Sequence, residues 1–290
     1  MLEDLIEQLV HGLTLGSMYA MVAAGLALMF GVVRLINFAH GEFFTLGAYA
    51  FWFALKTLGL PYPVAGLAAA LAMGGFGIAY ERTVIRAILE RSWHVQLIAT
   101  LATSITLTNL AMIAFGTQAK EVPTALSAKI LEIGGLRIAA QRLLVLAASL
   151  AVFALLHWFI ARTKMGKAMR AMSQNREACA VVGVDVSRVA LCTFALSAGL
   201  AGGAAALVTP LFSVFPDMGA LLTLKAFAAV IVGGFGYVQG AIAASFLIGV
   251  TESLAAGYVS YAYKDAIAFV IMIAVLLWRP QGLFGRRIGI

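Results

Sequence analysis

The longest apolar run of the chain is "LTLKAFAAVIVGGFGYVQGAIAASFLIGVTESLAA", residues 222–256, and the glycines at its centre decide how it folds. A helix that crosses a membrane needs about 20 apolar residues, because each residue adds about 1.5 Å toward a hydrocarbon core of about 30 Å. At 35 residues this run is too long for one such helix. Its central "GGFGYVQG", Gly233 to Gly240, is expected to break it into a shorter and a longer helix, although a single re-entrant segment would give the same pattern.

The composition of the whole chain is that of a membrane protein. Of its 290 residues, 62% are hydrophobic and only 11% are charged, whereas soluble globular domains carry about 25% charged residues. The net charge of +7 could suggest a nucleic-acid partner, but the lysines and arginines fall mainly in short gaps between apolar runs. That distribution sets orientation in a membrane, so we expect a polytopic integral membrane protein that contacts lipid and no nucleic acid.

The apolar runs together predict eight or nine membrane segments, and nine if residues 222–256 form two helices. In hydrocarbon every backbone polar group must be paired within the protein, so the expected fold is all-α. We expect a helical bundle that forms a single transmembrane domain over residues 1–290. The expected spans outside the longest run are 11–32, 39–55, 62–80, 95–116, 143–161, 189–212 and 265–278. Pairs of glycines four residues apart suggest close helix packing, at Gly12 and Gly16, Gly199 and Gly203, and Gly236 and Gly240.

The basic residues predict the orientation of the chain. With nine segments, one set of loops holds 13 lysines and arginines in 62 residues, and the opposite set holds 7 in 63. Because basic loops stay in the cytoplasm, the C-terminus is expected there and the N-terminus outside. The acidic start "MLEDLIEQLVHG" lacks the positive region of a cleaved signal peptide, so we expect it to be kept. The basic set comprises residues 31–37, 81–94, 162–190 and 279–290.

Two local expectations follow from this orientation. The segment 117–142 lies outside, and its apolar residues alternate around Gly134 and Gly135, which predicts a small external loop or hairpin. Cys179 and Cys192 lie in or beside the basic cytoplasmic segment, so both are expected to remain free thiols.

The cytoplasmic segment 162–190 begins with an amphipathic pattern. Three methionines recur at helical spacing on one face, polar residues occupy the other, and Gly183 is placed to end a helix. Such a helix could lie on anionic lipid, or its methionine face and polar groups could bind a partner protein. The methionines are Met165, Met169 and Met172, and the polar residues are Lys164, Lys167, Arg170, Gln174 and Glu177.

Polar residues within or beside the apolar runs are candidates for a transport pathway or gate. The string "NFAHGE" contributes Asn37, His40 and Glu42, which the charge argument places at the cytoplasmic end of the second span. They could line a pathway, or they could hold a tight turn between the first two spans. Asn109 and Gln239 are the other candidates. Three further ionisable residues lie near predicted span ends and are expected at the membrane interface: Lys225, Glu252 and Asp265.

The sequence lacks the motifs of nucleotide hydrolysis and of metal or hydrolase chemistry. The string nearest to a phosphate-binding loop, "MGKAM", has Ala161 and Ala168 where the glycine and the hydroxyl residue should be. The four histidines lie in different segments, and neither H-E-x-x-H nor G-x-S-x-G occurs. We therefore expect no enzyme activity, no metal and no cofactor bound by this chain.

Three long strings resemble one family in the same order and at similar spacing. They are residues 12–49, with "NFAHGE", the loop "GKAMRAMSQNREACAVVGV" of residues 166–184, and "AFAAVIVGGFGYVQGAIAASFLIGVTES" of residues 226–253. In these strings the chain resembles the LivH-type permeases of branched-chain amino acid importers of the ATP-binding-cassette (ABC) class. The resemblance covers nearly the whole chain.

The resemblance implies several partners in a bacterial inner membrane. They are a second, similar permease, two cytoplasmic ATPases that bind the ATP, and a periplasmic protein that delivers the solute. The string "EACAVVG" is similar to the E-A-A-x-x-x-G sequence by which importer permeases contact their ATPases, although the I-x-L-P continuation of that sequence is absent. The residues implied in ATPase coupling are Arg170, Gln174, Asn175, Glu177 and Gly183.

The expected function is therefore translocation of leucine, isoleucine and valine by alternating access, driven by ATPases on other chains. No residue separates these solutes from another amino acid, an amide or urea, which the same class of transporter could carry. An ion-coupled secondary transporter and a membrane scaffold without transport activity are the remaining alternatives.

Overall fold

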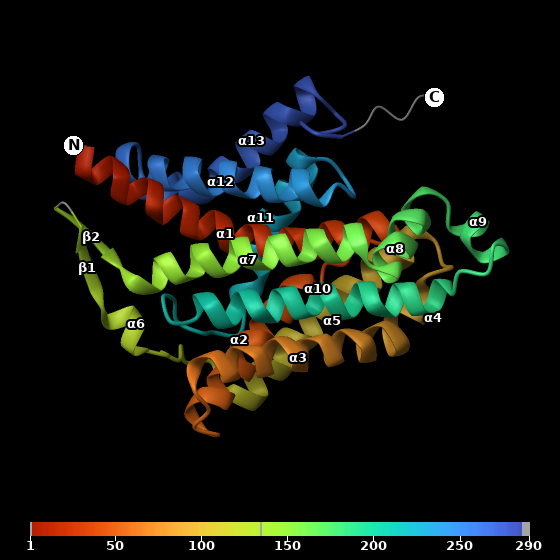
Figure 1. Ribbon diagram of the computed structural model, residues 1–290, viewed down its shortest axis with the longest axis horizontal. Helices are drawn as coiled ribbons and strands as arrows, with labels where there is room; N and C mark the ends of the chain where they lie inside the picture. Colours follow the sequence, from red (N-terminus) through yellow and green to blue (C-terminus); the bar gives the residue numbers. More distant parts are fainter. Residues whose placement is uncertain (1, 134, 286–290) are drawn as a thin grey trace.

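The computed structural model describes residues 2–133 and 135–285 as an elongated helical bundle (Figure 1). Seven helical segments of this part are long and apolar enough to cross a membrane, and one more apolar helix is shorter. These helices confirm the predicted polytopic, all-helical membrane fold. The helices of 15 residues or more are α1 (Leu2–Val33), α2 (His40–Lys56), α3 (Tyr62–Tyr80), α5 (Trp93–Phe115), α7 (Ala140–Arg162), α10 (Val186–Val208), α11 (Met218–Gly233), α12 (Val238–Tyr258) and α13 (Lys264–Trp278).

The predicted break in the longest apolar run separates α11 from α12. Gly234 and Gly236 have φ values of +105° and +75°, a backbone region that favours glycine. A Cβ on Gly233 would contact the backbone of Gly240, so the glycines also let the two helices approach. In Figure 1, α11 crosses the direction of the long helices and contacts α1, α2, α12 and α13. With 16 residues, or about 24 Å, it is shorter than a membrane span.

The centre of the bundle is made by α1 packing on α12 and by α10 packing on α3 and α2. The α1–α12 contact depends on residues without side chains. A Cβ on Gly12 would lie 2.7 Å from the Cα of Val250, and one on Gly249 would contact the backbone of Gly12 and Gly16. The predicted packing role of Gly12 and Gly16 is therefore confirmed.

We expect Gly249→Val to destabilise the fold by about 1–3 kcal/mol, because its side chain would force α1 and α12 apart. The yield and melting temperature of the detergent-purified protein, followed by fluorescence size-exclusion chromatography, measure this effect. Gly75→Val is the matched control, since a Cβ at Gly75 would have no atom of the described residues within 4 Å. Equal melting temperatures for the two variants would contradict the assigned packing role.

The short elements gather at the two ends of the bundle. At one end, β1 (Ile130–Ile133) pairs antiparallel with β2 (Leu136–Ala139), which confirms the predicted hairpin, and α6 (Ala125–Ala128) precedes it. At the other end lie α8 (Lys164–Gln174) and α9 (Arg176–Val181) (Figure 1). We call these the hairpin end and the α8–α9 end. The remaining short elements are η1 (Glu81–Ile85), α4 (Arg86–Ile88) and η2 (Tyr261–Tyr263).

Candidate functional site

The "NFAHGE" turn lies deep inside the bundle. A ring nitrogen of His40 lies 3.1 Å from the carbonyl oxygen of Val22, which is 11 residues, or about 16 Å, before the end of α1. Glu42 contacts Ser104, the middle of α5. These residues do lie at the start of the second helix, α2, as predicted, but the expectation that this end of α2 lies at the edge of the bundle is wrong. After α1 the chain turns back into the bundle through non-helical backbone over residues 34–37. A hydropathy pattern cannot predict this turn, because it does not report the direction of the chain.

Asn37 and His40 are fully buried and bind backbone and neighbouring helices. The Asn37 side-chain oxygen accepts hydrogen bonds from the Ala39 amide at 3.1 Å and from the Tyr80 hydroxyl at 3.2 Å. His40 packs on α1 where a Cβ at Gly25 would lie 3.0 Å from its ring. These contacts tie the turn to α1 and α3.

Glu42 is 1% exposed, and its two carboxylate oxygens differ. One accepts a hydrogen bond from the Ser104 hydroxyl at 3.1 Å, whereas the other has no partner within residues 2–133 and 135–285. Beside it, a Cβ on Gly41 would contact Gly219 and Thr223, so α2 and α11 cross with their backbones close together. This crossing places Glu42, which has no cationic partner among the described residues, near the starts of α2 and α11 and beside the middle of α5.

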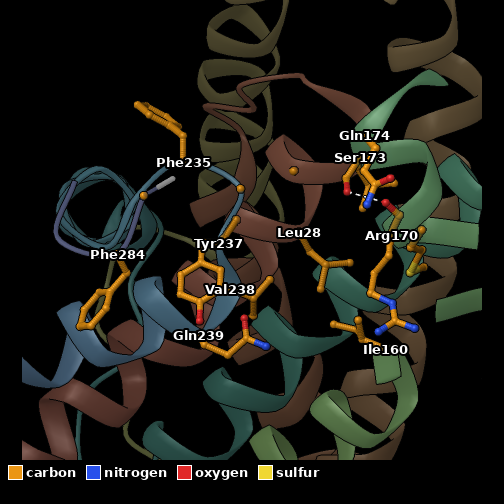
Figure 2. A pocket seen from close by; sticks show the side chains of 16 residues that line it. Leu28, Ile160, Arg170, Ser173, Gln174, Phe235, Tyr237, Val238, Gln239 and Phe284 are labelled. Carbon is orange, nitrogen blue, oxygen red and sulfur yellow. Dashed lines mark hydrogen bonds between the residues drawn. The ribbon is translucent and has the colours of Figure 1, made fainter. Parts of the chain in front are cut away.

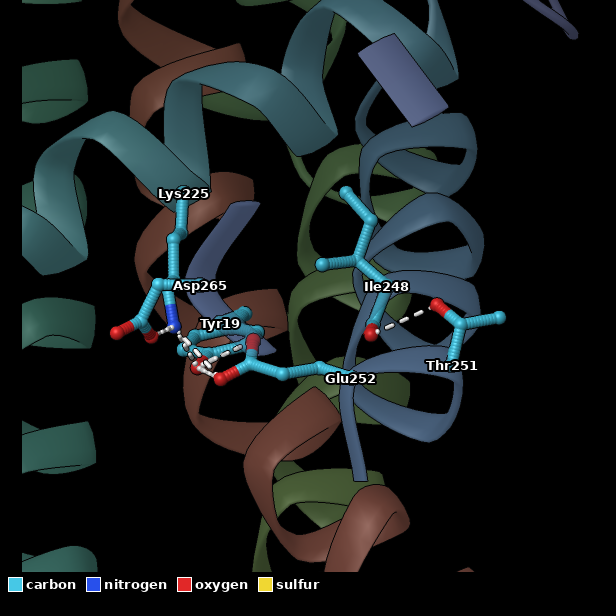
Figure 3. Close-up of polar contacts among 6 residues, drawn as sticks. All are labelled: Tyr19, Lys225, Ile248, Thr251, Glu252 and Asp265. Carbon is cyan, nitrogen blue, oxygen red and sulfur yellow. Dashed lines mark hydrogen bonds and ion pairs between the residues drawn. The ribbon is translucent and has the colours of Figure 1, made fainter. Parts of the chain in front are cut away.

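A second buried polar cluster joins four helices and corrects the sequence expectation (Figure 3). The Lys225 ammonium lies 2.7 Å from a Glu252 oxygen, 2.6 Å from an Asp265 oxygen and 3.1 Å from the Tyr19 hydroxyl. The side chains of Lys225 and Glu252 are 4% and 3% exposed, so these two residues are not at the membrane interface. The prediction failed because α11 crosses the bundle and carries Lys225 inward. We call Tyr19, Lys225, Glu252 and Asp265 the ionic cluster.

The other two pathway candidates lie elsewhere. Asn109 is exposed on α5, and its side-chain amide donates to the Ile105 carbonyl oxygen of its own helix at 2.7 Å. Gln239 is exposed in the first turn of α12. The five candidates therefore do not form one site.

The coupling candidates lie on or beside α8 and α9. Met169 and Met172 are 1% exposed, Met165 packs on the same core, and Arg170 donates to the Ala161 carbonyl oxygen at 3.3 Å. The amphipathic helix predicted from the methionines is therefore confirmed, and its apolar face packs against the bundle. Both cysteines are free, as predicted.

Two turns give α9 its shape. The Asn175 side chain accepts a hydrogen bond from the Ala178 amide at 3.0 Å and so caps the start of α9. Gly183, with φ +84°, follows its end, where the Val184 amide donates to the Cys179 carbonyl oxygen at 2.9 Å. The helix projects from the bundle with Val181 and Val182 88% and 77% exposed, and Glu177 is exposed on the same helix.

A cavity of about 560 Å³ lies between α8 and the α11–α12 turn (Figure 2). Arg170 and Gln174 line it from α8, and Gln239 lines it from α12. One pathway candidate and two coupling candidates therefore line the same cavity. The Arg34 guanidinium donates to the Gln174 carbonyl oxygen at 3.3 Å and links this region to the end of α1. The sequence predicts Gln239 only as a pathway residue, because its proximity to α8 is a long-range contact that no local sequence pattern indicates.

Residues 8–276 match the protein family described as "Branched-chain amino acid transport system / permease component". The chain belongs to this family. It is 33% identical to the permease protein BraD of Pseudomonas aeruginosa, a high-affinity branched-chain amino acid transport system protein, over 97% of this chain and 96% of BraD. It is 30% identical to the corresponding LivH of Salmonella typhimurium, with the same coverage.

The family identifies the chain as a permease component, not an enzyme, of a transport system. Together with the apolar helices, it makes this permease a multi-pass protein of the bacterial inner membrane. The permease is also 25% identical to LivM of Escherichia coli, over 93% of this chain and 68% of LivM. LivM is itself named as a permease protein of a branched-chain amino acid transport system, so this chain is similar to two differently named permeases of such systems.

Proposed function

We propose that this permease is the transmembrane subunit of an ABC importer that translocates leucine, isoleucine and valine delivered by a periplasmic binding protein. The family and the names of the relatives support the substrate class. The excess of basic residues in the loops of the α8–α9 end supports a cytoplasmic position for that end. The hairpin end and the N-terminus then face the periplasm.

Two cytoplasmic ATPases bind at α8 and α9 and supply the energy. The main support for this docking is the exposure of two adjacent valines, Val181 and Val182, at the tip of a projecting helix. Exposed apolar side chains in such a position suit insertion into a partner protein. Glu177 adds a charge on the same short helix. Because the methionine face of α8 packs on the bundle, movement of α9 by the ATPases would be transmitted to α1 and α10, which α8 contacts.

A second permease completes the pathway. The similarity to LivM supports a partner of the same fold and favours a heterodimer. On α5 the exposed residues include Thr106 and Asn109, which both use their side chains to bond carbonyl oxygens of their own helix. Polar groups are costly against lipid, so this face suits contact with the partner or with the transported solute.

We expect Glu42→Gln to keep uptake within about twofold of the wild-type rate. The amide still accepts the hydrogen bond from Ser104, and the change removes a buried charge that has no cationic partner among the described residues. Uptake of radiolabelled leucine into proteoliposomes that contain the complete transporter measures this rate. A loss of tenfold or more would favour an ion-coupled mechanism in which this carboxylate carries a proton.

The substrate assignment is tested on the partner binding protein. We expect leucine, isoleucine and valine to raise its melting temperature and to compete with each other for uptake by the complete transporter. Stabilisation by urea or an amide, with no effect of these three amino acids, would overturn the assignment while leaving the transporter class intact.

A further inference from the structure

The ionic cluster forms one wall of a cavity of about 400 Å³. The cavity lies between the first half of α1, the segment 208–218, α11 and the junction of α12 with α13. Its remaining wall is mostly apolar and includes two phenylalanines that are about two-fifths exposed, Phe212 and Phe215. The lining of the cavity therefore combines charged groups with hydrocarbon.

The ionic cluster is not balanced in charge. Lys225 faces two carboxylates, and its contacts with Tyr19, Glu252 and Asp265 occupy the three hydrogens that an ammonium can donate. The carboxylate of Glu252 accepts from both Lys225 and Tyr19. Asp265 is different, because its side chain is 42% exposed and its second oxygen has no hydrogen-bond partner within the described residues. Figure 3 shows this oxygen turned away from Lys225.

Lys264 and His11 also line this cavity. Lys264 precedes Asp265 in the chain, and its ammonium lies 3.9 Å from the centre of the Tyr261 ring. His11 has a buried ring nitrogen, Nδ1, that finds no hydrogen-bond partner in residues 2–133 and 135–285. The cavity thus offers one free carboxylate oxygen and two nitrogen groups beside an apolar wall.

We propose that this cavity binds a zwitterionic apolar α-amino acid within the permease itself. Asp265 receives the ammonium of the ligand, Lys264 and His11 receive its carboxylate, and the apolar wall with Phe212 and Phe215 receives its side chain. The inference rests on the proposed import of amino acids. It adds a ligand site in this chain, separate from the selection made by the binding protein.

Binding of radiolabelled L-leucine to the complete permease–ATPase assembly in lipid nanodiscs, without the periplasmic protein, tests the site. We expect saturable binding that Asp265→Asn weakens at least tenfold and Asp265→Glu partly restores. Asp265→Asn leaves Lys225 paired with Glu252, so the fold is kept. Isoamylamine and 4-methylpentanoate, which each lack one charged group of leucine, should compete at least tenfold more weakly than leucine.

A second variant tests the binding site without changing any charged residue. Met218→Trp places a large side chain in the cavity wall without changing the ionic cluster, and it should also weaken binding at least tenfold. Glu132→Gln, an exposed carboxylate on the hairpin, is the control and should bind as wild type does. Wild-type binding by both cavity variants would overturn the site, as would a cavity occupied by phospholipid that leucine does not displace.

The failure of this site is distinguishable from failure of the proposed function. If the wild-type assembly with ATP and the binding protein takes up leucine while Asp265→Asn and Met218→Trp bind and transport as wild type does, the site is wrong and the function stands. If the wild-type assembly takes up none of the three branched-chain amino acids, the proposed function is wrong.

Discussion

Lys225→Met should leave little folded protein. The substitution removes the cation of the ionic cluster and leaves the carboxylates of Glu252 and Asp265 close together without it. Breaking a buried ion pair by removing one partner costs about 3–5 kcal/mol, because the remaining charge stays buried without compensation. Here the same change also removes a contact that joins α11 to α1, α12 and α13.

The amount of monodisperse protein and its melting temperature measure this loss. Lys264→Met is the matched control. Lys264, which precedes Asp265 in the chain, makes no ion pair within the described part of the chain and contacts the Tyr261 ring. We expect the control to melt close to wild type. Equal melting temperatures for Lys225→Met and Lys264→Met would show that the ionic cluster does not hold these helices together.

Glu177→Arg should abolish transport while the permease still inserts and folds. Glu177 is exposed on α9, so the change costs little folding free energy. At a partner interface, however, replacing a negative by a positive charge puts like charges or unpaired groups against the ATPase. We expect recovery of the ATPases with the tagged permease to fall at least tenfold, and uptake to fall with it.

Glu90→Arg makes the same charge change at another exposed glutamate, just after α4 in a loop with the same predicted orientation. It should leave ATPase recovery near the wild-type level. If Glu177→Arg retained the ATPases as well as Glu90→Arg does, α9 would not be the docking helix, whatever its effect on transport.

Local patterns in the sequence predicted much of this fold. The break at Gly233 to Gly240 and the amphipathic α8 each depend on residues within a few turns of one another, and both are confirmed. The hairpin of β1 and β2 is confirmed for the same reason. Hydropathy and spacing describe neighbours along the chain, and these elements need no other information.

The depth of the polar residues could not be predicted in the same way. Tyr19 and Glu252 are 233 positions apart, and Glu42 and Ser104 are 62 apart, yet each pair is hydrogen-bonded. Hydropathy places a residue by its distance from the end of its own apolar run. That rule fails where residues 34–37 return into the bundle and where α11 crosses it, because both segments depart from the spanning direction.

The cavity beside α8 shows the same limit for the candidate site. The sequence singled out Arg170, Gln174 and Gln239, but only the packing of the α11–α12 turn against α8 brings them together. Gly31 and Gly236 let the end of α1 approach the same turn. Their spacing alone could not identify the partner helix.

In the proposed function, ATP hydrolysis on partner subunits drives transport through this permease. The most direct measurement is leucine uptake into proteoliposomes that contain the complete transporter and binding protein, with ATP or a non-hydrolysable analogue at the ATPases and with or without a protonophore. We expect uptake that requires hydrolysable ATP and that the protonophore leaves unchanged. Uptake without ATP that follows an imposed proton gradient and stops when the protonophore is added would contradict the account.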